Sequence, residues 1–173
     1  MSNTLSLHRA WGVSIFAILL LAGRPALAEK PTIVLLPFTG GVAPTQDICG
    51  FDIGVTPREG RPNGQRLILF GNTGIIAGSL SNTLTNLSTG KSIDVNVSGP
   101  GRLIFSETTT TVVAMGPGVF WSHPLSPELA AAAGLPRVFL LDGRIVFTVD
   151  GQRNTISIQS VTGTVQDPCQ LLQ

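Results

Sequence analysis

Charged residues are scarce in this chain, and histidine, cysteine and tyrosine are scarcer still. Only 12% of the 173 residues are charged, and there are two His, two Cys and no Tyr. Residues 29–173 keep all ten acidic residues but lose Arg9 and Arg24 from the eleven basic ones, so their net charge is −1. A nucleic-acid-binding protein normally carries a clustered basic surface. The composition therefore predicts no nucleic-acid partner.

Motifs for cofactors and for common catalytic sites are also missing. His123 is the only His after residue 28, and with two distant Cys it supplies too few ligands for a metal site. The Gly-x-Ser-x-Gly elbow of serine hydrolases is absent. Thr89-Gly90-Lys91-Ser92 has Thr85 where a phosphate-binding loop needs glycine. No cofactor and no metal are predicted.

No apolar run reaches the roughly 20 residues of a membrane-spanning helix. The longest, residues 10–22, follows Arg9 and precedes the small-residue pattern that ends at Ala28. This order is typical of a secretory signal peptide. We expect residues 1–28 to be removed between Ala28 and Glu29, which leaves an exported chain without a membrane span. An uncleaved N-terminal anchor is the alternative.

The two cysteines are predicted to pair. An exported chain meets an oxidising compartment, in which disulfides persist. Cys49 and Cys169 lie near the two ends of the mature chain, without the Cys-x-x-Cys spacing of redox-active pairs. A structural Cys49–Cys169 disulfide is therefore expected in a secreted or extracytoplasmic protein.

Short β-strands separated by turn residues dominate the pattern after residue 49. Residues 91–98 alternate, with Ile93 and Val95 on one face of a half-buried strand. Gly116-Pro117-Gly118 is predicted to end a strand, and Asp142-Gly143 to form a hairpin turn between apolar runs. Asp150-Gly151 offers a second turn.

Two further features qualify this β pattern. Ser126, Pro127 and Gly134 are typical capping residues, so one short helix is predicted over residues 126–133. In the last strand, residues 155–165, the apolar positions change parity, which predicts a β-bulge.

The fold predicted from these elements is all-β. About 8–10 short strands joined in sequential hairpins favour a single antiparallel, up-and-down β-barrel over residues 49–173, with a β-sandwich as the alternative. Residues 29–48 are expected to form an N-terminal arm, in which residues 32–36 are apolar enough to add an edge strand.

Three short motifs resemble a group of small exported bacterial proteins of the actinobacterial type. They are Cys49-Gly50-Phe51, then Thr85-Asn86 with Thr89-Gly90-Lys91, and finally the Asp-x-Cys-x-Leu-Leu close from Asp167 to Leu172. The likeness spans residues 49–172. The group has no assigned activity, so the resemblance implies export and a β fold and transfers no catalytic residue.

The most distinctive stretch is residues 116–124. Phe120, Trp121 and His123 are candidates to line a ligand pocket, since aromatic walls with one polar group are typical of such sites. The same residues also fit a simpler role, in which Trp121 closes one end of the core and His123 is exposed on a loop.

Two functions from different classes are compatible with these features. The first is a non-enzymatic exported protein that binds a small apolar ligand or an envelope partner. The second is a small enzyme, such as an isomerase or cyclase, that works through an apolar cavity. The second would require His123, Glu107 or Asp52 to face the interior of the domain.

Overall fold

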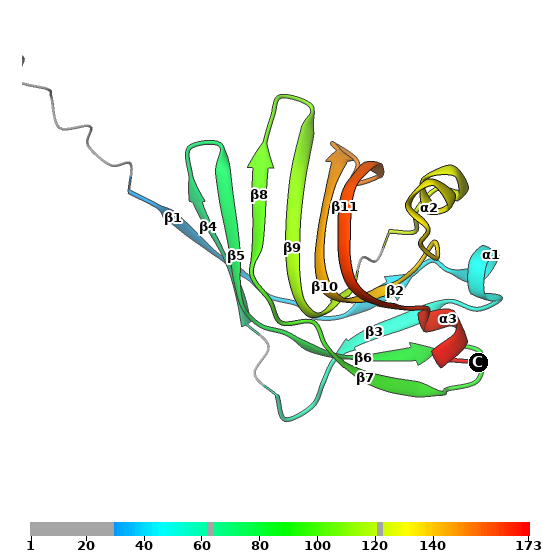
Figure 1. The fold of residues 1–173 in the computed structure, drawn as a ribbon. Helices are drawn as coiled ribbons and strands as arrows, with labels where there is room; N and C mark the ends of the chain where they lie inside the picture. Colours follow the sequence, from blue (N-terminus) through cyan, green and yellow to red (C-terminus); the bar gives the residue numbers. More distant parts are fainter. Residues whose placement is uncertain (1–29, 62–63, 121–122) are drawn as a thin grey trace, which may run out of the picture.

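The computed structural model describes residues 30–61, 64–120 and 123–173 of the chain. Their strands form two antiparallel sheets, with three short helices beside them (Figure 1). The larger sheet contains, in spatial order, β1 (Thr32–Leu36), β4 (Gly64–Phe70), β5 (Thr73–Ser79), β8 (Gly101–Phe105), β9 (Thr109–Phe120), β10 (Leu140–Asp150) and β11 (Thr155–Gln166). The smaller sheet contains β2 (Gly41–Ala43), β3 (Ile53–Pro57), β6 (Ser81–Asn86) and β7 (Ser92–Asn96).

The helices are α1 (Gln46–Cys49), α2 (Pro127–Ala133) and α3 (Pro168–Leu171). None of the helices in the described part of the chain has the length and apolar character needed to cross a bilayer. The predicted signal peptide and its cleavage site between Ala28 and Glu29 lie outside the described residues.

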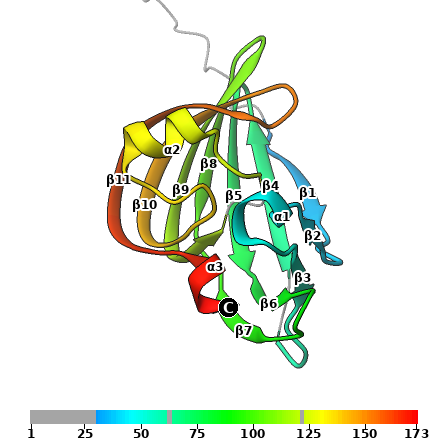
Figure 2. The ribbon, with the colours of Figure 1, turned by 90° about the vertical axis from the view of Figure 1, so that its right-hand side faces the viewer.

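The predicted closed barrel is wrong. The larger sheet ends at open edges on β1 and β11, and the smaller sheet ends at β2 and β7. The two sheets form a sandwich-like arrangement, the alternative that the sequence also allows (Figure 2). The physical reason is that consecutive strands change sheet four times, from β1 to β2, β3 to β4, β5 to β6 and β7 to β8. Three of these changes take place through residues 37–40, Leu80 and residues 97–100. Turn residues indicate where strands meet, but they do not indicate where a strand bends from one sheet into another.

Two glycine segments predicted as turns lie inside long strands. Gly116-Pro117-Gly118 belongs to β9 and Asp142-Gly143 belongs to β10. Gly143 pairs with Gly116 on one side and with Gly163 on the other, and all three have positive φ angles. A Cβ on Gly143 would lie 2.0 Å from the carbonyl oxygen of Thr162. These glycines therefore allow three backbones to approach closely where the strands bend, instead of ending the strands.

The predicted helix is confirmed, with the expected residues at its ends. The Ser126 side chain accepts a hydrogen bond from the Leu129 N–H at 3.3 Å, and Pro127 is the first helical residue. Gly134 ends α2 in the left-handed conformation, at a φ of 63°. A capping serine and a left-handed glycine are what a helix of this length needs to satisfy its terminal backbone groups.

The strand patterns at residues 91–98 and 155–165 are also confirmed. β7 exposes every second residue and partly buries Ile93 and Val95. The β10–β11 register passes from Val146 opposite Ser160 to Phe147 opposite Ile158, so one residue of β11 is left over and forms the bulge. The β10–β11 hairpin turns at the predicted Asp150-Gly151.

The core consists of two clusters that meet at β10. Leu140 belongs to the cluster on the smaller sheet, and the adjacent Leu141 belongs to the cluster under α2, because successive strand residues point to opposite faces. The cluster under α2 contains Val112, Leu125, Ala130, Leu135, Phe139, Leu141, Ile145, Phe147 and Val149. The cluster on the smaller sheet contains Ala43, Phe51, Ile53, Val55, Leu84, Val138, Leu140 and Leu172.

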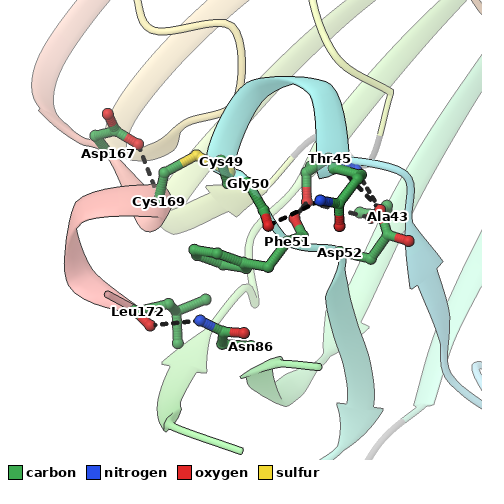
Figure 3. The surroundings of a disulfide bond; sticks show 11 residues. Ala43, Thr45, Cys49, Gly50, Phe51, Asp52, Asn86, Asp167, Cys169 and Leu172 are labelled. Carbon is green, nitrogen blue, oxygen red and sulfur yellow. Dashed lines mark hydrogen bonds between the residues drawn. A yellow bond between two sulfur atoms is a disulfide. The ribbon is translucent and has the colours of Figure 1, made fainter. Parts of the chain in front are cut away.

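A disulfide joins the ends of the folded domain, as predicted. Cys49 ends α1 and Cys169 lies in α3, with their Cα atoms 5.0 Å apart (Figure 3). Beside it, the buried Asn86 donates a hydrogen bond from Nδ2 to the carbonyl oxygen of Leu172 at 3.0 Å. The disulfide and this hydrogen bond both attach the C-terminal helix to the smaller sheet and its neighbour α1.

Removing the disulfide should cost a large share of the stability of this fold. Replacing both Cys49 and Cys169 by Ala is expected to lower the free energy of unfolding by about 2–5 kcal/mol, because the bond closes a loop of 120 residues. Guanidinium titration of the variant and of the parent, each with and without dithiothreitol, would measure this. A reductant effect of the same size in the Ala variant would contradict the assignment of the loss to the disulfide.

The close approach at Gly143 can be tested with a matched glycine. Gly143→Ala is expected to lower the free energy of unfolding by about 2–4 kcal/mol, because its Cβ would collide with backbone at a positive φ. Gly151→Ala is the control, since a Cβ there would meet nothing within 4 Å. Equal unfolding midpoints for the two variants in urea would show that the backbones do not approach as described.

Candidate functional site

Strand register places apolar side chains on one face of the larger sheet. Leu67 on β4 pairs with Ile76 on β5, and Ile76 pairs with Gly101 on β8. Two residues beyond Gly101, Leu103 pairs with Val112 on β9. Paired residues point to the same side of a sheet, and so do residues two apart on one strand. These apolar side chains therefore share one face, the inner face, which continues onto β10.

The connection between β9 and β10 covers only one end of the inner face. α2 and the flanking Leu125, Leu135 and Phe139 pack over β9–β11. Figure 1 shows α2 beside the β10–β11 end of the sheet, with β4 and β5 towards the other end. There the described residues leave an open pocket of about 540 Å³, called the sheet pocket. It is lined by Leu36, Leu67, Ile76, Leu103, Phe105, Thr110, Val112, Val149, Asp150, Gly151 and Arg153.

The polar side of the sheet pocket comes from the turn between β10 and β11. Asp150 Oδ1 accepts hydrogen bonds from the backbone N–H groups of Gln152 at 2.8 Å and Asn154 at 2.9 Å. Its Oδ2 accepts one from Asn154 Nδ2 at 3.0 Å. The side-chain and backbone hydrogen bonds of Asn154, with that of Gln152, lower the pKa of Asp150, so this carboxylate is ionised at neutral pH. Asp150 therefore organises the turn that carries Arg153 to the pocket.

The chemistry of the sheet pocket is that of an apolar binding site. Seven of its lining side chains are Leu, Ile, Val or Phe, and its volume lies within the roughly 300–1,000 Å³ typical of ligand pockets. Among the described residues no group of three or more His, Cys, Asp or Glu side chains is arranged to hold a metal. The pocket thus offers an apolar surface with few polar groups at one side.

Neither Phe120 nor His123 lines the sheet pocket. Phe120 lines a second pocket of about 250 Å³, the corner pocket, together with Phe38, Val55 and Asn82. Asn82 is only 4% exposed, and its Oδ1 has no hydrogen-bond partner in the described structure. Trp121 lies outside the described residues. His123 is partly buried after β9 and is not among the lining residues of either pocket.

The residues named for the enzyme hypothesis are not brought together. Asp52 Oδ1 accepts hydrogen bonds from the N–H groups of Thr45 and Gln46, both at 2.9 Å, and so serves the first turn of α1 (Figure 3). Glu107 is exposed in the turn between β8 and β9. Neither carboxylate lines the sheet pocket or the corner pocket.

The sheet pocket was not predicted from the sequence, although a signal for it exists. Residues 67–70, 75–77 and 103–105 are continuous apolar runs, so they place apolar side chains on both faces of the sheet, more than α2 can cover. Counting the covering elements against the apolar faces would have indicated an open region. The position of the pocket still depends on the strand order. β5 and β8 are neighbours in the larger sheet because β6 and β7, which lie between them in the sequence, belong to the smaller sheet.

A third cleft has a different character. It has a volume of about 310 Å³ and lies where β7 approaches β9, β10 and β11. Asp94, Asn96, Asp142, Thr164 and Gln166 contribute polar groups to it. This lining fits water and polar molecules better than an apolar ligand, so the sheet pocket remains the candidate site.

Comparison with known proteins adds no functional information. No protein-family model, curated protein or solved structure gives a significant match to this chain.

The Asp52 side chain is expected to stabilise the start of α1. Asp52→Ala is expected to lower the free energy of unfolding by about 1–2 kcal/mol, because two N–H groups at the start of α1 lose their acceptor. Asp52→Asn should cost less than half as much, since its amide oxygen can still accept both hydrogen bonds. Urea titration of both variants would measure this, with the exposed Glu107→Gln as the control. Equal losses for Asp52→Ala and Asp52→Asn would show that the charge, and not the acceptor, matters.

Proposed function

We propose that this chain is an exported protein that binds a small apolar ligand in the sheet pocket without transforming it. The observation that carries this proposal is the part of the inner face that no described element covers, an apolar pocket of about 540 Å³. Apolar side chains exposed together in a concave site gain free energy when a ligand removes them from water, at roughly 25 cal/mol per Å². An apolar ligand would bury the inner face at this end of the sheet, as α2 buries it at the other end.

Export is supported by two independent features. Residues 1–28 have the order of a basic residue, an apolar segment and a small-residue cleavage pattern. The Cys49–Cys169 disulfide is compatible with an oxidising compartment outside the cytoplasm. A small apolar molecule is poorly soluble in such an aqueous compartment, so a carrier or sensor of that molecule needs an apolar pocket to bind it.

A second candidate function uses the same pocket. An isomerase or cyclase acting on an apolar substrate also needs a concave apolar site with few polar groups, and the sheet pocket has Thr110 and Arg153 among its lining residues. Native mass spectrometry of the protein isolated from its host would separate the two. A bound molecule that is recovered unchanged after prolonged incubation supports binding alone, whereas its conversion to an isomer supports the enzyme.

Binding in the sheet pocket can be tested with the neutral apolar dye N-phenyl-1-naphthylamine, which fluoresces when it leaves water. Leu67→Gln is expected to weaken dye binding by about tenfold, because Leu67 lines the pocket and one buried leucine contributes about 1.5 kcal/mol. Leu35→Gln is the matched control. Leu35 is 76% exposed, and it pairs with Arg66, so it points to the opposite face of the sheet from Leu67.

Fluorescence titration of the parent and both variants provides the measurement, and circular dichroism shows whether each is folded. Equal weakening in Leu35→Gln and Leu67→Gln, or no saturable binding to the parent protein, would contradict the proposed site.

A further inference from the structure

The turn that borders the sheet pocket holds an arginine in an unusual backbone conformation. Arg153 has a φ of 69°, and it is the only residue other than glycine with a positive φ in the described part of the chain. The left-handed region is unfavourable for a residue with a Cβ, and glycine or asparagine would occupy it more easily. Both are present in this turn, as Gly151 and Asn154, yet arginine occupies this position. The backbone of the turn therefore does not account for the choice of Arg153.

The charge of Arg153 is not compensated within the described structure. Its side chain forms no ion pair there, whereas Arg58 is paired with Asp94 at 3.0 Å. Asp150, the other charged residue of the pocket lining, already accepts three hydrogen bonds from its own turn. Strand alternation also directs the Asp150 side chain to the face opposite Val149, which lies on the inner face. The guanidinium of Arg153 is thus the available charge at the border of an apolar pocket.

Other polar groups at this border suit the same kind of partner. Thr110 follows the first residue of β9 and shares the inner face with Val112, two residues further on. Its hydroxyl can donate one hydrogen bond, and a guanidinium can donate two parallel hydrogen bonds to a carboxylate. The apolar wall formed by Leu67, Ile76 and Leu103 extends from this border along the sheet.

We propose that the ligand of the sheet pocket is a single-chain amphiphile with an anionic head group. Its hydrocarbon chain would lie on the apolar wall, and its carboxylate would contact Arg153 at the β10–β11 turn. This inference rests on the proposed binding function, and it adds the chemical class of the ligand and the residue that recognises its charge.

The test compares decanoate with 1-decanol, which share a chain and differ in the charge of the head group. Both are titrated against dye-loaded full-length mature protein, and displacement of N-phenyl-1-naphthylamine reports binding. Arg153→Gln is expected to weaken decanoate binding by about fivefold, the upper value for an exposed ion pair, and to leave 1-decanol binding unchanged. Raising the salt concentration should weaken decanoate binding to the parent protein and have little effect on the variant.

Two further variants separate charge from backbone strain. Arg153→Lys keeps the positive charge, and is expected to retain most of the decanoate affinity. Arg153→Gly removes the charge, and also the unfavourable φ, so it should weaken decanoate binding while its thermal midpoint rises. A loss of binding in a more stable protein cannot result from unfolding.

The outcomes of these titrations distinguish the binding function from the class of ligand. If neither decanoate nor 1-decanol displaces the dye from the parent protein, the proposed binding function fails and this inference fails with it. If both displace the dye and Arg153→Gln changes neither affinity, binding stands and the anionic class is overturned. If phosphatidylglycerol vesicles bind the protein through Arg153 while free decanoate does not, the head group recognised belongs to a membrane surface, and the single-chain ligand is overturned.

Discussion

The apolar inner face of the seven-stranded sheet is the constraint on which the rest of the molecule depends. A sheet that carries apolar side chains on one face has to bury that face against another element. At the β9–β11 end, α2 and its flanking residues do so, and Leu125 and Leu141 become almost completely buried. At the β4–β8 end no described element covers the face, and the uncovered side chains there line the sheet pocket. Core and candidate site are therefore two ends of one surface, which differ only in whether the chain itself covers them.

The smaller sheet and the disulfide hold the two ends of the folded domain together. Strands that change sheet at Leu80 and at residues 97–100 divide one long meander into two packed layers. The smaller layer buries Ile53 and Leu84 against Leu172, and the disulfide anchors α3 beside it. None of the buried residues of this cluster, and neither cysteine, lines the sheet pocket. The contacts that hold the C-terminal helix and the residues that would contact a ligand therefore lie in different parts of the fold.

Several elements could be predicted because their causes are local. Ser126, Pro127 and Gly134 specify the ends of α2 within one stretch of chain, and the alternation at Ile93 and Val95 specifies a half-buried strand. Other predictions failed where a distant contact decided the outcome. Asp142-Gly143 has the composition of a hairpin turn, but its glycine is needed for the approach to Thr162 across the sheet. Phe120 lines the corner pocket instead of the sheet pocket, and His123 lines neither, because the stretch that contains them does not encode which distant strands remain uncovered.

The sequence by itself determined the β class of the chain, the helix α2, the disulfide partners and the bulge in the last strand. Each of these follows from residue types acting on their own neighbours or, for the two cysteines, from there being a single possible pair. Only the tertiary structure decided between sandwich and barrel, and only it placed Arg153 in the lining of the same pocket as Leu67 and Leu103. The physical reason is that sheet order and the cover over a face arise from contacts between residues far apart in the chain, and periodicity in one segment does not encode its distant neighbours.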